Sequence, residues 1–263
     1  MNDWYKDWFA ADEYLELYAN RDFKEAKKLV DLILKFCDEN NFEIKNVIDI
    51  ACGFGRHALI FAQNGIQTFA FDLSYRFLQI AAKLKEKSNI NNLHFFCADV
   101  LRSPIKFKFD LATNLFTSFG YFLRDKDNFE VLKNIASLVK IDGLFVFDYF
   151  NSNFIKKNLT PYEEKFVNNK KFSITRTIIN NRAIKEIAIC INGKTKRYIE
   201  SVKIYDTFEI KNMFNKLGLK IINIKGTYEG SDFDENSSER LIIFSKKMIY
   251  FVNRLKNTSK NAF

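Results

Sequence analysis

The fold is decided by one stretch near the middle of the first half, Asn46-Val-Ile-Asp-Ile-Ala-Cys-Gly-Phe-Gly-Arg-His-Ala58. Its apolar residues predict a buried strand over 46–51, and a helix is expected to begin near Arg56. Gly53 and Gly55 lie between the two elements. Because glycine has no Cβ, the backbone there can turn sharply and approach a ligand closely. The stretch therefore predicts a strand, a glycine turn and a helix.

Outward from this stretch, strands and helices alternate. The expected strands are 46–51, 67–71, 93–97, 109–115, 144–149, 220–226 and 240–246, and the expected helices are 23–40, 55–64, 75–87, 127–139 and 207–217. Such alternation predicts an α/β protein with a doubly wound, mostly parallel sheet that helices cover on both faces.

The pattern changes between residues 170 and 205. Segments 172–178, 183–191 and 196–204 largely alternate apolar and polar residues, and Asn180-Asn181 and Asn192-Gly193 separate them. Asn-Gly is a favoured two-residue hairpin turn. We expect an inserted three-stranded antiparallel meander. The chain then divides into an α/β domain (1–150 and 207–246), an inserted substrate-side subdomain (151–206) and a C-terminal tail (247–263).

Three acidic residues follow predicted strands. Asp49 ends the first strand, Asp72 the second and Asp99 the third. Ligands of parallel α/β sheets bind at the carboxyl ends of the strands, so these carboxylates are expected in one site. Together with a glycine turn they suit a polar, hydroxylated and partly cationic ligand. We interpret the site as a pocket for S-adenosylmethionine (SAM).

A dinucleotide is the alternative ligand. Gly53-x-Gly55-x-x-Ala58 also fits the fingerprint G-x-G-x-x-G/A, and Asp72 follows at a spacing that suits a ribose-binding acid. That fingerprint brings a pyrophosphate to the helix N-terminus, where Asp49 would add an unfavourable negative charge. Asp99 has no role in the dinucleotide scheme, but it suits the amino group of adenine. These two acids favour SAM over a dinucleotide-dependent oxidoreductase.

The first 22 residues are rich in aromatic side chains. These are Trp4, Tyr5, Trp8, Phe9, Tyr14 and Tyr18, followed by Arg21. Such a segment must pack on other parts of the protein. Two interpretations stay open: the segment packs on the domain core, or it forms a lid over the cofactor in which Arg21 binds a carboxylate.

Composition excludes several classes of protein. The 263 residues carry a net charge of +9, but the lysines are spread over every predicted helix, which disfavours a nucleic-acid-binding patch. No apolar run reaches the length of a membrane span, and the first residues lack signal-peptide features. The 4 cysteines occur singly, which favours reduced, buried thiols in a cytoplasmic protein. No metal-ligand set is expected.

Taken together, these motifs resemble those of class I SAM-dependent methyltransferases over roughly residues 40–150 and 207–246. The segment Phe109-Asp-Leu-Ala-Thr-Asn-Leu-Phe-Thr-Ser-Phe-Gly-Tyr-Phe122 is similar to the fourth-strand motif of glycine N-methyltransferases and bacterial aminosugar N,N-dimethyltransferases. Those families carry an antiparallel insert after the fifth strand and an aromatic N-terminal lid. The resemblance implies a seven-stranded sheet whose last strand is antiparallel. Ala51 stands where many members have glycine, and Tyr121 where these relatives often have histidine.

The resemblance also implies roles for individual residues. Asp49 and the backbone from Ala51 to Gly53 would hold the methionine end, with the backbone of Leu115 near its amino group. Asp72 would bind the ribose hydroxyls. Leu73 and Val100 would enclose the adenine, and Asp99 would accept a hydrogen bond from its amino group. With the lid, the expected cofactor-binding residues are Tyr14, Arg21, Asp49, Ala51, Cys52, Gly53, Asp72, Leu73, Asp99, Val100 and Leu115.

The expected activity is methyl transfer to a small polar molecule, to nitrogen more than to oxygen. A sulfonium is an activated leaving group, so alignment is the main requirement. Tyr121 is the polar group expected to orient the acceptor, and His57 and His94 are interpreted as structural. The alternative acceptor is RNA or another macromolecule, but the Pro-Pro-aromatic motif of many base methyltransferases is missing at 114–117. Homodimerisation is compatible with the sequence.

Overall fold

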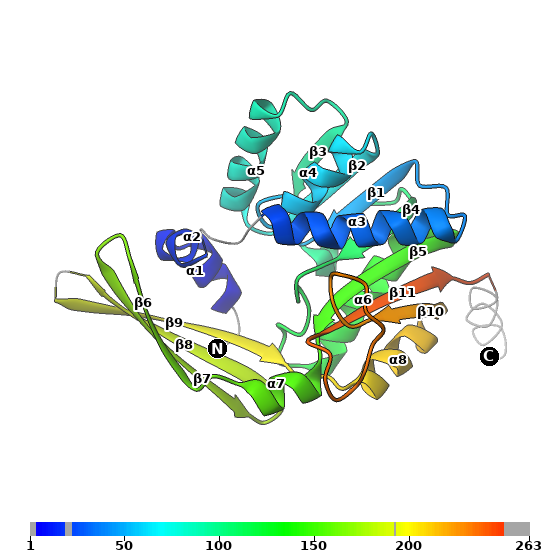
Figure 1. The fold of residues 1–263 in the computed structure, drawn as a ribbon. Helices are drawn as coiled ribbons and strands as arrows, with labels where there is room; N and C mark the ends of the chain where they lie inside the picture. The colour runs from blue at the N-terminus through cyan, green and yellow to red at the C-terminus, as the bar shows by residue number, and fades with distance from the viewer. Residues whose placement is uncertain (1–3, 19–22, 192, 250–263) are drawn as a thin grey trace, which may run out of the picture.

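The structure, a computed structural model, describes residues 4–18, 23–191 and 193–249 (Figure 1). The expectations for Arg21, for the turn residue Asn192 and for most of the tail 247–263 therefore lie outside the described residues. None of the helices in the described ranges is both long and apolar enough to cross a membrane.

A seven-stranded sheet forms the centre of the α/β part, in the order β10-β11-β5-β4-β1-β2-β3. Its strands are β1 (Asn46–Ile50), β2 (Gln67–Asp72), β3 (Leu93–Cys97), β4 (Phe109–Asn114), β5 (Val139–Phe150), β10 (Leu219–Lys225) and β11 (Arg240–Lys247). β11 runs antiparallel to both β5 and β10, and the other pairs are parallel. The predicted fold class is confirmed.

Helices cover both faces of this sheet. They are α3 (Phe23–Glu39), α4 (Arg56–Gln63), α5 (Tyr75–Lys87), α6 (Asp125–Leu138) and α8 (Thr207–Lys216). Val47 packs in a cluster with α3 and α4, whereas its neighbour Ile48 packs in a cluster with α6 and α8. Successive side chains of a strand point to opposite faces, so a strand covered on both faces has to be apolar throughout.

A second sheet of four antiparallel strands is inserted after β5. It comprises β6 (Tyr162–Val167), β7 (Lys170–Ile179), β8 (Arg182–Ile191) and β9 (Lys194–Lys203), and α7 (Ser152–Asn158) leads into it. The expected meander is present, but its count of three strands was wrong. β6 is an edge strand with exposed Tyr162 and Phe166, so it lacks the alternation of a half-buried strand.

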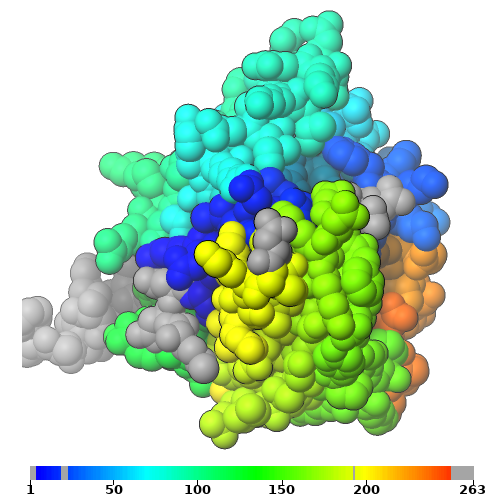
Figure 2. Space-filling view, turned by 90° about the vertical axis from the view of Figure 1, so that its left-hand side faces the viewer, coloured from blue at the N-terminus to red at the C-terminus, as the bar shows by residue number. Residues whose placement is uncertain are grey.

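Two short helices, α1 (Trp4–Ala10) and α2 (Asp12–Leu17), precede α3. Trp8 and Tyr14 pack in one apolar cluster with residues of the second sheet and with Phe77 of α5. Figure 2 shows this N-terminal segment between the second sheet and the α/β part. The segment thus joins the two parts of the molecule.

The cysteines differ from the expectation. Cys37 and Cys52 are buried free thiols, but Cys97 and Cys190 are exposed. Cys97 is the last residue of β3, at the edge of the main sheet, and Cys190 lies on the outer face of β8. A residue on an edge strand, or on the uncovered face of a sheet, is open to solvent. The apolar residues around both cysteines led to the wrong expectation that they are buried.

Candidate active site

The glycine turn links β1 to α4 through residues with positive φ. Ala51 has φ 56°, Gly53 φ 55° and Gly55 φ 71°. A Cβ at Gly55 would lie 2.6 Å from the ring of Phe95, so a larger residue there would have to displace this ring in addition to adopting a left-handed φ. A Cβ at Gly53 would meet no atom within 4 Å, so this part of the turn borders open space. The left-handed conformation is unfavourable for a residue with a Cβ, so Ala51 is a strained position in the turn.

Asp49 lies at the end of β1 and is 1% exposed. Thr113 donates a hydrogen bond to its Oδ1 over 2.8 Å, while Oδ2 has no hydrogen-bond partner among the described residues. Burial raises the pKa of Asp49 to about 7, against the hydrogen bond from Thr113. A buried carboxylate with an unused oxygen fits a cationic group such as the α-amino group of a methionine moiety.

Asp72, at the end of β2, ties that strand to the glycine turn. Its Oδ2 accepts from the main-chain N–H of Gly53 over 2.9 Å, and its Oδ1 accepts from that of Ser74 over 2.8 Å. Burial raises the pKa of Asp72, and the backbone hydrogen bonds oppose this rise. Each carboxylate oxygen retains a further lone pair, which is what a pair of ribose hydroxyls requires.

Two adjoining cavities open at the carboxyl ends of the strands. The first has a volume of about 490 Å³ and is lined by Asp72, Leu73, Asp99, Val100 and Tyr121 among others. Asp99 also caps the short 3-10 turn Val100–Arg102, accepting from the N–H of Leu101 over 2.9 Å. An acid and two apolar side chains beside Asp72 form a slot of the kind that adenosine occupies.

The second cavity, of about 370 Å³, lies at the glycine turn. Its lining includes Tyr14, Asp49, Ala51, Cys52, Gly53, Asp72, Leu115 and Tyr121. Ala51, Asp72, Ser118 and Tyr121 line both cavities, which therefore adjoin. Every sequence-predicted site residue within the described ranges lines at least one of them.

A charged row on the second sheet was missed by sequence analysis. Arg176 of β7 is in register with Lys185 of β8, which is in register with Glu200 of β9, and all three line the second cavity. Their side chains are only 22%, 17% and 19% exposed. Period-two alternation places them on the same face as Ile174 and Ile187, but their alignment across three strands follows from the register, which the sequence alone does not give.

A second missed group holds the loop after β4. Phe116 and Thr117 both have positive φ, 58° and 62°. The N–H of Phe116 donates to Asp148 Oδ2 over 2.8 Å, and that of Thr117 donates to the Asp148 carbonyl over 3.0 Å. Asp148 is fully buried and pairs with Arg240 over 2.7 Å. These bonds hold a strained turn against the second cavity.

The two histidines differ in position. His57, in α4, is buried beside Arg56 and lines the second cavity, and burial lowers its pKa to about 3, so its imidazole is neutral. His94 lies in β3, where its ring is 2.7 Å from the side-chain nitrogen of Gln67 at the start of β2. It lines neither cavity.

Comparisons with known proteins identify relatives of this chain. Residues 47–143 match the family described as a methyltransferase domain. A protein of Geobacillus sp. (strain WCH70) named as a methyltransferase is 23% identical over 213 residues, which cover 77% of this chain and 85% of that protein.

Solved structures share the fold. An S-adenosylmethionine-dependent methyltransferase from Clostridium acetobutylicum superposes with a TM-score of 0.77 at 22% identity, covering 93% of this chain and 99% of that one. SAM-bound CalS10, an amino pentose methyltransferase from Micromonospora echinaspora, has a TM-score of 0.65 at 14% identity, covering 90% and 98%.

The matched methyltransferase domain and the named relatives indicate an enzyme that uses S-adenosylmethionine, and the fold agrees with this. The chain is a SAM-dependent methyltransferase, and residues 47–143 are its methyltransferase domain.

Proposed function

We propose that the enzyme transfers the methyl group of SAM to a small polar molecule, with nitrogen preferred over oxygen as the acceptor atom. The observation that carries this proposal is the second cavity. It takes the methionine end of SAM at the glycine turn, adjoins the adenosine slot, and is also lined by residues of α1, α2 and the second sheet. A cavity of this size, lined from both parts of the molecule, suits a small acceptor better than a polymer.

In this proposal the α/β part (1–150 and 207–246) binds SAM. Asp49 accepts from its α-amino group, Asp72 binds the ribose hydroxyls and Asp99 accepts from the adenine amino group. Leu73 and Val100 enclose the adenine ring. The backbone from Ala51 to Gly53 and that of Leu115 border the methionine end. Tyr14 covers this end from the N-terminal helices. Arg21, in the same segment, is retained from sequence analysis alone.

The insert (151–206) supplies the acceptor side. The row Arg176, Lys185 and Glu200 is flanked in register by apolar residues: Ile174 and Ile187 on one side, Ala183 and Val202 on the other. Burying charges within an apolar face is unfavourable unless they have partners. Arg176 pairs with Glu163, and Glu200 accepts from Trp8 and Tyr18 of the N-terminal segment. The charged row therefore gives the acceptor side of the cavity a polar lining, which suits a polar acceptor.

Methyl transfer from a sulfonium requires the acceptor lone pair in line with the breaking C–S bond. SAM supplies the activated methyl group, so the residues of this chain must hold the acceptor and leave its nucleophile unprotonated. A low-dielectric cavity lowers the pKa of an amine, which yields the neutral nucleophile without a strong base. Tyr121, between the two cavities, is the group proposed to orient the acceptor. CalS10, whose name specifies an amino sugar, supports nitrogen as the acceptor atom.

The experiment that tests this proposal supplies methyl-labelled SAM with three acceptor mixtures in parallel: small amines, small alcohols and total RNA with DNA. We expect label in the amine mixture only. The matched control is Asp72→Ala, which removes the proposed ribose contact and should abolish transfer at limiting SAM. Label in nucleic acid that depends on Asp72 would replace the small acceptor by a macromolecule.

A further inference from the structure

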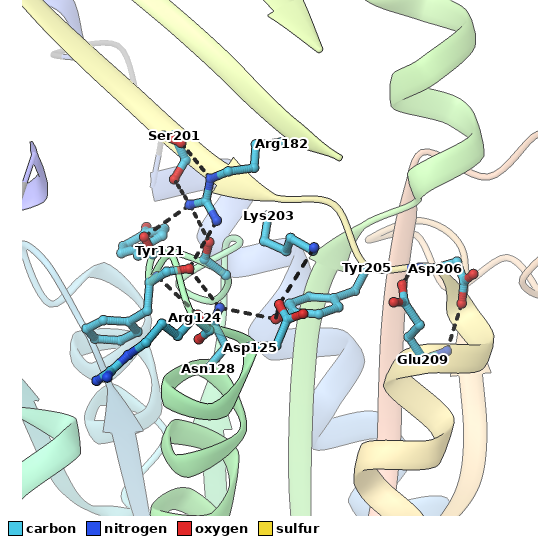
Figure 3. Close-up of polar contacts among 12 residues, drawn as sticks. Tyr121, Arg124, Asp125, Asn128, Arg182, Ser201, Lys203, Tyr205, Asp206 and Glu209 are labelled. Atoms are coloured by element: carbon cyan, nitrogen blue, oxygen red, sulfur yellow. Dashed lines mark hydrogen bonds and ion pairs between the residues drawn. The ribbon is translucent and has the colours of Figure 1, made fainter. Parts of the chain in front are cut away.

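Arg182, the first residue of β8, is 9% exposed, and it extends from the second sheet to the loop that follows β4 (Figure 3). Its Nε donates to Ser201 Oγ over 2.7 Å and its Nη2 to the Ser201 carbonyl over 2.7 Å. The remaining contacts are with the loop: Nη1 with the carbonyl of Phe122 over 3.0 Å, and Nη2 with those of Gly120 and Tyr121 over 3.2 and 3.1 Å.

These acceptors are four carbonyls and one hydroxyl, none of which carries a net charge. Burial lowers the pKa of the Arg182 guanidinium, which is the sign of an unfavourable desolvation. Keeping a cation in such a place costs free energy unless many hydrogen bonds compensate it. Arginine can make them because its donors form a rigid planar fork, whereas lysine offers a single ammonium group.

The loop fits tightly against β9 at Gly120. Gly120 has φ +86°, and a Cβ there would lie 3.0 Å from the carbonyl oxygen of Lys203. The N–H of Lys203 in turn donates to the Gly120 carbonyl over 2.7 Å. The backbone at Gly120 is therefore held by β9 as well as by Arg182.

The other end of the loop is held by Asn128 of α6. Its Oδ1 accepts from the N–H of Phe122 over 3.1 Å, and its Nδ2 donates to the Phe122 carbonyl over 2.9 Å. The same Nδ2 lies 3.1 Å from the hydroxyl of Tyr205, which donates to Asp125 (Figure 3). Arg182 of the second sheet and Asn128 of the α/β part thus both form hydrogen bonds with the backbone of Phe122.

Tyr121 is the residue whose position these contacts determine. Its ring lines both cavities and lies 5.1 Å from the ring of Trp4 and 6.0 Å from that of Phe9, centroid to centroid. The main-chain carbonyls of Tyr121 and of both its neighbours accept from Arg182.

We propose that Arg182 is a positioning residue for methyl transfer. It fixes the Gly120–Phe122 loop to the second sheet and so determines the position of the Tyr121 ring, which borders both cavities. The inference rests on the acceptor role of Tyr121 in the proposed function. Arg182 acts through the loop and does not itself line either cavity.

The test uses the full chain with a fluorinated tyrosine at position 121 and S-adenosylhomocysteine bound, and follows its fluorine resonance. Arg182→Lys keeps the charge but loses the fork. We expect a cooperatively folded protein whose Tyr121 resonance shifts and broadens or splits. Arg197→Lys, at an exposed arginine of β9, is the matched control and should leave the resonance unchanged.

A single sharp resonance at the wild-type position in folded Arg182→Lys would overturn the inference. If that variant does not fold, Ser201→Ala replaces it, because this change removes only the acceptor of Nε. A shift of the resonance away from its wild-type position is then expected, and an unchanged resonance would overturn the inference. No acceptor is present, so the outcome does not depend on which molecule is methylated.

Discussion

The cofactor side and the acceptor side of the site are built in different ways. The acids of the cofactor side follow β1, β2 and β3 within about fifty residues, and Asp72 is held by N–H groups of the neighbouring turn. On the acceptor side, Trp8 donates to Glu200, which is 192 residues away in sequence. The cofactor side is local in sequence and the acceptor side is not.

Because of this difference, the two halves of the site depend on different parts of the chain. A change on the cofactor side should affect SAM binding and leave the N-terminal helices in place. A change on the acceptor side should loosen the contact between the N-terminal helices and the second sheet.

The largest effect is expected from Asp72→Ala. The loss of a charge-assisted pair of hydrogen bonds to the ribose should weaken SAM binding by about 2–3 kcal/mol. Because Asp72 also accepts from Gly53 and Ser74, a modest fall in melting temperature should accompany it. Calorimetric titration gives the affinity, with Asp38→Ala, an exposed acid of α3, as the control. Unchanged affinity in the folded variant would make Asp72 purely structural.

Glu200→Ala should act on the acceptor side. It leaves the Trp8 Nε1–H and the Tyr18 hydroxyl without their acceptor, at a cost of about 1–3 kcal/mol. Amide exchange in residues 4–18 should therefore become faster, while exchange in β1 and α4 stays as in the wild type. Glu186→Ala, at the neighbouring exposed acid of β8, is the control. Equal acceleration in both regions would show that the two halves are not separable.

The pH dependence of Asp49 gives a smaller effect. Its pKa of about 7 exceeds the ordinary 3.8, so the folded protein binds the proton more tightly than the unfolded chain. In the absence of ligand, the contribution of Asp49 to stability is complete below about pH 4 and is lost as the pH rises toward 7.

Ligand binding should show the opposite trend, because the α-amino cation selects the ionised carboxylate. The affinity for S-adenosylhomocysteine should rise about twentyfold between pH 5.5 and 7.5, in step with the ionised fraction of Asp49. Titrations at both values, repeated with Asp49→Asn, test this. A rise of the same size in the Asn variant would assign the titration to another group.

The smallest effect concerns the N-terminal helices, which sequence analysis interpreted as core packing or as a lid. Their contacts with the second sheet and with Phe77 do not decide between the two. If they are a lid, S-adenosylhomocysteine should slow amide exchange in residues 4–18. The same segment in Asp72→Ala, at a ligand concentration that saturates only the wild type, is the control. Equal exchange with and without ligand would show that the segment packs on the core and is not a lid.

Sequence reasoning succeeded where the signal is local. Continuous apolar runs predicted the seven strands of the main sheet, and Asp49, Asp72 and Asp99 were expected at one edge of it because each closes such a run. β6 escaped because its apolar residues face solvent. The charged row and Arg182 escaped because their meaning depends on register and on partners from distant segments. An isolated Arg, Lys or Glu in a strand looks like an ordinary solvent-facing residue.

The most direct test of the account is a calorimetric titration of the wild-type protein with S-adenosylhomocysteine and, separately, with NAD. We expect one molecule of S-adenosylhomocysteine to bind per chain and NAD to give no heat of binding. The Asp49 carboxylate repels a pyrophosphate and attracts an amino group. Binding of NAD with no response to S-adenosylhomocysteine would contradict it.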